Sequence, residues 1–197
     1  MGLLALLLVG CLQPEAADEV PTGIDALLPP REQFALAPVA TDAGPGDAPR
    51  QLACGPTSGR VLRFKVRTLP TGGRFAPKNV GAIWITDKDG SFVKTLKVWG
   101  ELRAKWLEAW QGSSGGDRTD AITGATLSGH ETHEILWPMT DHAGCEILPG
   151  LYNIRVELTD RSGKGANLSL PFEKADAPLS MLPADAEFFR DMALSLE

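Results

Sequence analysis

The residues best suited to chemistry in this chain form a short segment rich in hydroxyl groups and glycine, D-A-I-T-G-A-T-L-S, at Asp120–Ser128. Its small Gly-Ala pair predicts a turn that leaves the hydroxyl of Thr126 with little steric cover. An acidic residue, Asp120, lies six residues before that hydroxyl. The arrangement suits a hydroxyl that a separate enzyme must reach and phosphorylate. The alternative is a purely structural turn, in which Thr123 and Thr126 are ordinary loop hydroxyls.

The same segment resembles the flavinylation motif, D-x-x-[ST]-G-A-[TS], of the FMN-binding domains in membrane sodium-pumping and electron-bifurcating complexes. In that family a flavin transferase links FMN to the last Thr through a phosphoester, so the resemblance implies covalent FMN on Thr126. Those domains continue into a helix that helps to cradle the flavin. Here Gly129 and a predicted strand follow, so we expect Thr126 to accept a flavin without a pre-built pocket. The matching positions are Asp120, Thr123, Gly124, Ala125 and Thr126, and Ser128 also fits.

The first eleven residues predict an export signal of the lipoprotein type. Leu3–Val9 is an apolar run too short to span a bilayer as a helix. The run ends at Leu8-Val9-Gly10-Cys11, which resembles the lipobox of bacterial lipoproteins. The resemblance implies lipidation of Cys11 and a lipid-anchored periplasmic protein. No Lys or Arg precedes the run, and the alternative is a buried N-terminal strand that ends in a free Cys.

Residues 12–55 are rich in Pro, Ala, Asp and Gly and predict a disordered tether, which leaves 56–197 for one folded domain. The net charge is -6 without a cluster of Lys or Arg, which argues against nucleic acid as a partner. If Cys11 carries lipid, Cys54 and Cys145 remain and could form one disulfide in an oxidising compartment. Two unpaired thiols are the alternative.

Alternation of apolar and polar residues predicts the strands that must position the Asp120–Ser128 segment. One stretch has a different period: Leu102, Trp106 and Trp110 recur at helical spacing and predict a helix over 101–111. The fold class predicted is therefore all-β, an antiparallel β-sandwich with one inserted short helix and a long loop within 100–129. The predicted strands are residues 60–68, 80–86, 92–99, 130–137, 151–158, 166–172 and a closing strand around 192–196. In the last stretch Phe188, Met192 and Ser195 would also suit a helix, but the alternation of Met192, Leu194 and Leu196 favours the strand.

Two resemblances cover the folded part. Residues 137–152 follow the W…D…G…P-G-x-Y order of Ig-like domains akin to that of the flagellar hook-capping protein, which implies an Ig-like sandwich. Residues 60–197 resemble the domain of unknown function 2271 (DUF2271), a family of uncharacterised periplasmic proteins. Its members share paired strands, a Trp-bearing helix, a D-A-x-[ST]-G-A-T loop and the Ig-like segment. This family looks associated with flavin transferases and membrane haem proteins of the PepSY type, which are therefore the expected partners.

Other candidate sites are weaker. His130 and His133 are three residues apart and would point to opposite faces of a strand, and adding His142, Asp141 and Cys145 does not specify a ligand set, so we expect no metal. No hydrolytic set of residues has a diagnostic spacing, so no catalytic residue is assigned. Trp106 and Trp110 could stack on a flavin or simply pack the helix. Arg103, Lys105 and Arg118 could pair with a phosphate or remain solvated.

The sequence thus predicts a periplasmic lipoprotein that bears covalent FMN at Thr126 and transfers electrons. The alternative is a cofactor-free, Ig-like binding or scaffold lipoprotein of the cell envelope. Either is a redox carrier or binding module rather than a stand-alone enzyme.

Overall fold

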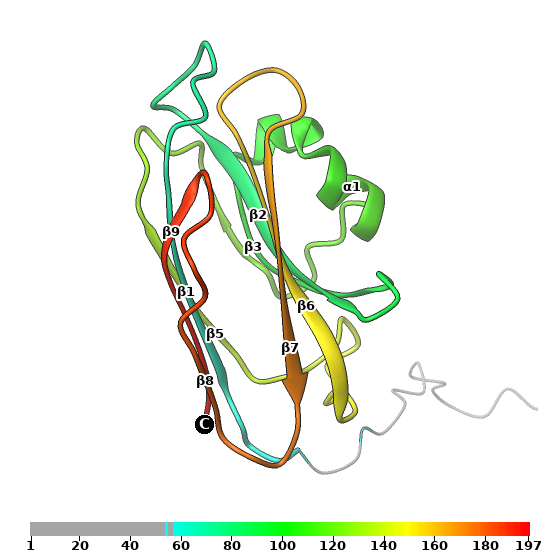
Figure 1. The fold of residues 1–197 in the computed structure, drawn as a ribbon. Helices are drawn as coiled ribbons and strands as arrows, with labels where there is room; N and C mark the ends of the chain where they lie inside the picture. The colour runs from blue at the N-terminus through cyan, green and yellow to red at the C-terminus, as the bar shows by residue number, and fades with distance from the viewer. Residues whose placement is uncertain (1–53, 55–56) are drawn as a thin grey trace, which may run out of the picture. The chain divides into compact units, whose positions relative to one another are not determined.

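The computed structural model describes residue 54 and residues 57–197 (Figure 1). The predicted signal, the lipidation of Cys11 and, apart from Cys54, the tether lie outside the described residues. Two sheets face each other, which confirms the predicted all-β sandwich with a short helix. Their strand orders are β5-β1-β9-β8 and β4-β3-β2-β6-β7. The strands are β1 (Leu62–Thr68), β2 (Val80–Asp87), β3 (Phe92–Trp99), β4 (Ile122–Gly124), β5 (Thr132–Trp137), β6 (Gly150–Thr159), β7 (Ala166–Lys174), β8 (Leu179–Met181) and β9 (Phe189–Leu196).

The main core lies between the two sheets, and the alternation in the sequence decides which side chains enter it. Leu62, Phe64 and Val66 of β1 are fully buried while the residues between them are exposed. A fully buried aliphatic or aromatic side chain contributes about 1.5–3 kcal/mol relative to an exposed one. The predicted closing strand is confirmed as β9, which pairs with β1.

Strand β2 is buried on both faces, and its second face positions the helical segment. Ile83 and Ile85 point into the main core, whereas Ala82 and Trp84 belong to a second apolar cluster with Trp110. The helical segment covers this outer face of the sheet, as Figure 1 shows. A short helix can therefore be stable here because tertiary packing supports it.

The predicted single helix over 101–111 is wrong in detail. A 3-10 helix, η1 (Glu101–Trp106), and an α-helix, α1 (Glu108–Ser114), are separated at Leu107. Leu102 is 94% exposed, so it does not share a buried face with Trp110. The break has a non-local cause: the buried carboxylate of Glu157 on β6 accepts hydrogen bonds from the backbone N–H groups of Ala109 (3.3 Å) and Trp110 (2.9 Å). Glu157 thus fixes where the first turn of α1 begins.

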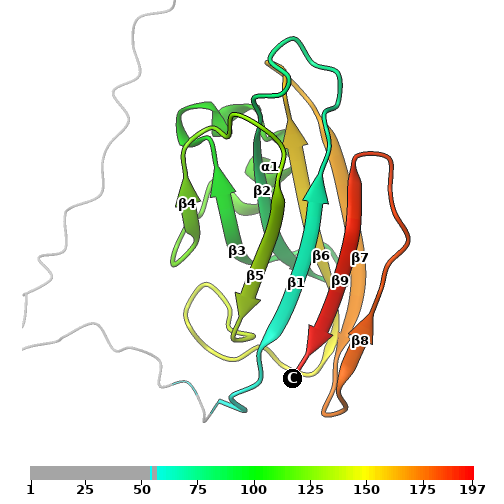
Figure 2. The ribbon, with the colours of Figure 1, turned by 90° about the vertical axis from the view of Figure 1, so that its left-hand side faces the viewer.

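The long loop predicted within 100–129 contains a strand. β4 pairs in parallel with β3, with Lys97 opposite Ile122 and Trp99 opposite Gly124. It forms one edge of the five-stranded sheet (Figure 2). The middle of the D-A-I-T-G-A-T segment is therefore part of a sheet rather than a free loop.

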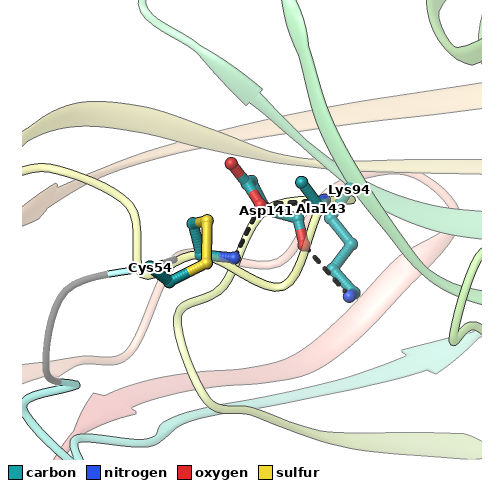
Figure 3. The surroundings of a disulfide bond; sticks show 5 residues. Cys54, Lys94, Asp141 and Ala143 are labelled. Atoms are coloured by element: carbon teal, nitrogen blue, oxygen red, sulfur yellow. Dashed lines mark hydrogen bonds between the residues drawn. A yellow bond between two sulfur atoms is a disulfide. The ribbon is translucent and has the colours of Figure 1, made fainter. Parts of the chain in front are cut away.

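The two ends of the sandwich are built differently, and we call them the closed end and the open end. The closed end holds the disulfide between Cys54 and Cys145, next to a turn in which the Asp141 carboxylate accepts backbone hydrogen bonds from Ala143 and Cys145, both at 2.9 Å (Figure 3). The open end, at the opposite ends of β2 and β6, holds the loop 69–79 and the turn 160–165.

Candidate functional site

Backbone hydrogen bonds hold the D-A-I-T-G-A-T segment on both sides of Thr126. Upstream, the carbonyl of Gly124 accepts a hydrogen bond from Gly100 N (2.9 Å) at the end of β4. Downstream, Leu127 exchanges two backbone hydrogen bonds with Asn79, at 3.0 and 3.1 Å. Thr126 therefore lies in a short extended span between two fixed points.

The side chain of Asn79 ties this span to the core, a role that the sequence analysis missed. Its Oδ1 accepts a hydrogen bond from Trp99 Nε1 (2.8 Å), and its Nδ2 donates to the carbonyl of Gly129 (2.9 Å). Both Asn79 and Trp99 are buried. A polar residue directly before a strand is only a weak signal, because the sequence does not reveal partners that lie 20 and 50 residues away.

Gly124 does not form the expected turn. It is the last residue of β4, and its φ is not positive. A Cβ placed there would lie 3.8 Å from the Cβ of Trp99, which is an ordinary van der Waals contact. The backbone therefore does not require glycine at this position, and any requirement for it must come from outside the fold.

Thr126 lies where two depressions in the surface meet. The first, which we call the motif groove, has a volume of about 840 Å³ and is lined by η1 and by Thr123–Thr126. The second, which we call the end cleft, has a volume of about 290 Å³ and lies at the open end. Arg103, Trp106 and Thr126 line both. The side chain of Thr126 is partly exposed, and its Oγ1 accepts a hydrogen bond from Arg103 Nη1 (3.3 Å).

The surroundings of Thr126 carry unpaired positive charge. Lys78, Arg103, Lys105 and Arg161 line the two depressions, and none of them takes part in an ion pair among the described residues. The acidic neighbour Glu101 pairs instead with Arg118 (3.1 Å). In a chain of net charge -6 this is a local site suited to an anion such as a phosphate.

Asp120 is not beside Thr126. It lies at the other end of β4, with a positive φ of 55°, and pairs with the buried Lys94 (3.4 Å). Lys94 Nζ also donates to the carbonyl of Asp141 (3.1 Å), which belongs to the closed-end turn (Figure 3). Asp120 also lines a separate depression, in which Thr126 takes no part. It can therefore position the start of the segment, but it has no contact through which to act on the Thr126 hydroxyl.

The two helical tryptophans have different environments. Trp106 is partly exposed and lines both depressions, so it is available to pack against a ligand. Trp110 is fully buried and donates a hydrogen bond to Thr95 Oγ1 (3.0 Å), so it supports the helix. Arg118 lies over the Trp110 ring at 5.4 Å and lines neither depression.

His133 packs in the core rather than forming a metal site. His133 is fully buried and stacks on Trp99 with ring centroids 4.2 Å apart, and its Nδ1 lies 3.0 Å from Lys97 Nζ. Burial, together with the nearby Lys97 and His130, lowers the pKa of His133 to about 3, so the ring is neutral at physiological pH. Among residues 54 and 57–197 no group of three His, Cys, Asp or Glu side chains is placed to hold a metal ion.

Residues 78–188, more than half of the chain, match the family model described as "Predicted periplasmic protein (DUF2271)". The matched region contains both helices, β4 and Thr126. No curated protein and no solved structure matches. Within the described part of the chain, no helix has the length and apolar character needed to cross a membrane.

Proposed function

Since the chain belongs to the DUF2271 family of predicted periplasmic proteins, we propose that it is a lipid-anchored electron-transfer subunit of the periplasm that carries FMN in a phosphoester bond to Thr126. One observation carries the proposal. The Thr126 hydroxyl is partly exposed at the meeting point of two depressions, and the Arg103 guanidinium lies within hydrogen-bond distance of it. A phosphate attached to this oxygen would lie next to a cation that has no carboxylate partner among the described residues.

The attachment is a group transfer from FAD, carried out by a separate flavin transferase. The Thr126 oxygen attacks the phosphorus of the FMN half of FAD, and the bond from that phosphorus to the bridging oxygen breaks. AMP leaves with the bridging oxygen, and the hydroxyl proton passes to a base of the transferase. No atom changes its oxidation state, so the reaction needs no oxidant or reductant.

The residues of this chain bind and orient the group. Arg103 would hold the phosphate and Trp106 would offer an aromatic face, while the contacts of Asn79 with Trp99 and Gly129 fix the chain next to the attachment point. Asp120 acts as a positioning residue through its ion pair with Lys94. Bound FMN supplies the reversible electron transfer that the protein side chains cannot perform. In this proposal the flavin would carry electrons between membrane donors and periplasmic acceptors.

The test is the intact mass of the full chain, co-produced with a flavin transferase in a bacterium that exports it. We expect a mass increase of one phosphoester-linked FMN, which disappears in Thr126→Ala. Thr119→Ala is the matched control, because Thr119 is an exposed hydroxyl just before the motif. Gly124→Ala adds a second readout: its Cβ fits the fold, so loss of FMN in that variant would mean that the transferase itself reads the glycine.

An unmodified chain, with a known acceptor domain labelled in parallel, would contradict the proposal. The better account would then be the cofactor-free binding module. One observation favours that alternative: the exposed apolar side chains of Ile122 and Leu136 line one depression, together with Lys94 and Asp120. Exposed apolar surface bordered by polar residues is typical of protein interaction sites.

A further inference from the structure

We propose that the end cleft, rather than the motif groove, is the docking site of the aromatic ring system of the flavin. This inference rests on the proposed function, because it assumes that the flavin is attached at Thr126. It adds a location for the ring and names residues outside the D-A-I-T-G-A-T segment that contact it. The aromatic and basic residues that line the end cleft are Phe75, Lys78, Arg103, Trp106 and Arg161.

Size separates the two depressions. The end cleft, at about 290 Å³, is at the lower limit of the ~300–1,000 Å³ that is typical of small-molecule sites. It is therefore suited to one compact ring system. The motif groove is almost three times larger and is bordered by the 94%-exposed Leu102. A ring placed in the groove would remain largely in contact with water.

Two aromatic side chains line the end cleft, whereas only Trp106 lines the groove. Phe75 comes from the loop 69–79 and is 40% exposed, a large exposure for a side chain of this type. The guanidinium of Arg74 lies 4.5 Å from the centroid of its ring. Aromatic rings favour offset or edge contacts with one another, so Phe75 and Trp106 together offer a flavin two such contacts.

The loop that presents Phe75 is firmly anchored. The buried carboxylate of Asp160 accepts hydrogen bonds from the backbone N–H groups of Thr71 (2.8 Å) and Gly73 (2.9 Å). The carbonyl of Asp160 accepts a third, from Phe75 N (3.0 Å). A Cβ at Gly73 would lie 2.1 Å from Asp160 Oδ1, so the loop packs too closely for any side chain there. The backbone of Phe75 is therefore held in a defined position.

The negative charge of Asp160 is compatible with a flavin in the end cleft. Burial raises the pKa of its carboxyl, but the hydrogen bonds from Thr71 and Gly73 outweigh that effect and lower the pKa. The carboxylate of Asp160, which also lines the cleft, therefore stays ionised, and its oxygens are occupied by these hydrogen bonds. The cations at the cleft are different. Among the described residues, Arg161 Nη2 donates to Thr71 alone, at its carbonyl (3.2 Å) and its hydroxyl (3.3 Å), so its charge remains available to an anionic ligand.

The attachment point connects these features. Thr126 lines the end cleft as well as the groove, so a ring system tethered at Thr126 stays next to Phe75 and Arg161 at high effective concentration. A site too weak to hold free FMN can therefore be occupied by the attached group. The groove then stays open on the side of β4.

The experiment uses the full chain loaded with FMN and measures how readily acrylamide, a neutral quencher, quenches the flavin fluorescence. We expect Phe75→Ala to lower the ratio of docked to free ring by about three- to tenfold, because one aromatic contact is lost. Arg161→Gln should act in the same direction. Leu102→Ala is the matched control, because Leu102 lines only the groove. Thermal unfolding by circular dichroism verifies that each variant is folded.

Each outcome decides the question. Increased quenching in Phe75→Ala and Arg161→Gln, but not in Leu102→Ala, supports the end cleft. The reverse pattern, or equal quenching in all variants, overturns it. If the wild-type chain takes up no FMN, the proposed function fails, and the docking proposal, which assumes the attached flavin, fails with it. A chain that is loaded with FMN but shows the reverse or equal pattern overturns the docking proposal alone.

Discussion

The two ends of the sandwich use charged residues in opposite ways. At the closed end, Lys174 and Glu146 are 2.8 Å apart and their side chains are only 10% and 13% exposed. Ser58 Oγ also donates to the same carboxylate, at 2.6 Å. At the open end, Lys78, Arg103 and Arg161 lie next to Thr126 without a carboxylate partner in the described part of the chain.

The charged residues at the two ends therefore have different roles. Paired and buried charges at the closed end leave little capacity for a ligand, and they cross-link the start of the domain to the loop before β6. Unpaired cations at the open end contribute little to stability but are available to an anion. We therefore expect changes at the closed end to alter stability and changes at the open end to alter ligand binding.

The largest effect on stability should come from the disulfide. Cys145→Ser removes a cross-link between residues 91 positions apart, and we expect the free energy of unfolding to fall by roughly 2–5 kcal/mol. Urea unfolding of the full chain measures this change, and the wild type under reducing conditions should show the same loss. Incorporation of FMN at 25 °C should be unchanged. A variant that folds but takes up no FMN would show that the two ends are not independent.

Two buried tryptophans allow a matched comparison of the stability lost when an indole hydrogen bond is removed. Trp99 donates its indole N–H to Asn79 near the open end, and Trp137 donates its own to the carbonyl of Thr140 near the closed end, both at 2.8 Å. Trp99→Phe leaves a buried acceptor unpaired, and we expect it to lower the free energy of unfolding by about 1–3 kcal/mol. Trp137→Phe should lower the free energy of unfolding by no more than this amount, since Thr140 is partly exposed.

Only the first of the two substitutions should slow FMN incorporation, because Asn79 holds the chain on the downstream side of Thr126. Urea unfolding and the initial rate of incorporation would be measured on both variants. Equal rates in Trp99→Phe and the wild type, despite a loss of stability, would mean that the support by Asn79 does not matter for attachment.

The smallest expected effect is a change in stability that occurs only at acidic pH. Hydrogen bonds from Lys174 and Ser58 lower the pKa of Glu146 from 4.5 to about 2. A lowered pKa in the folded state means that the ionised carboxylate stabilises the fold above pH 4.5, and that this stabilisation is lost as the pH falls towards 2. Glu146→Gln should remove that part of the pH dependence. Urea unfolding at a series of pH values tests it, and parallel curves for the variant and the wild type would contradict the assignment.

Local patterns predicted most of the sandwich. The strict alternation in β1 has a single physical interpretation, since one face of the strand must be buried. β4 could not be predicted in the same way, because three residues that end in glycine show no alternation and their partner is a parallel strand more than twenty residues away. The break of the helix at Leu107 could not be predicted either, because the residue that causes it, Glu157, lies on β6, far away in the sequence.

The candidate site was predicted in part. The sequence identified Thr126, Arg103 and Trp106, which the fold brings together at one point of the surface. It placed no weight on Phe75 or Arg161, because loop residues carry no periodicity and the turn that brings them near Thr126 depends on the hydrogen bonds of Asp160. It also grouped Asp120 with Thr126, although β4 separates the two.

The parallel pairing of β4 with β3 has a consequence for timing. The extended shape of the motif depends on a neighbouring strand, so an unfolded polypeptide does not display it in this form. A transferase that recognises this shape would therefore discriminate between folded and unfolded copies, and would modify the chain only after the sheet has assembled. If the chain carries FMN as proposed, the covalent label would act as a record of successful maturation, and poorly folded copies would remain without it.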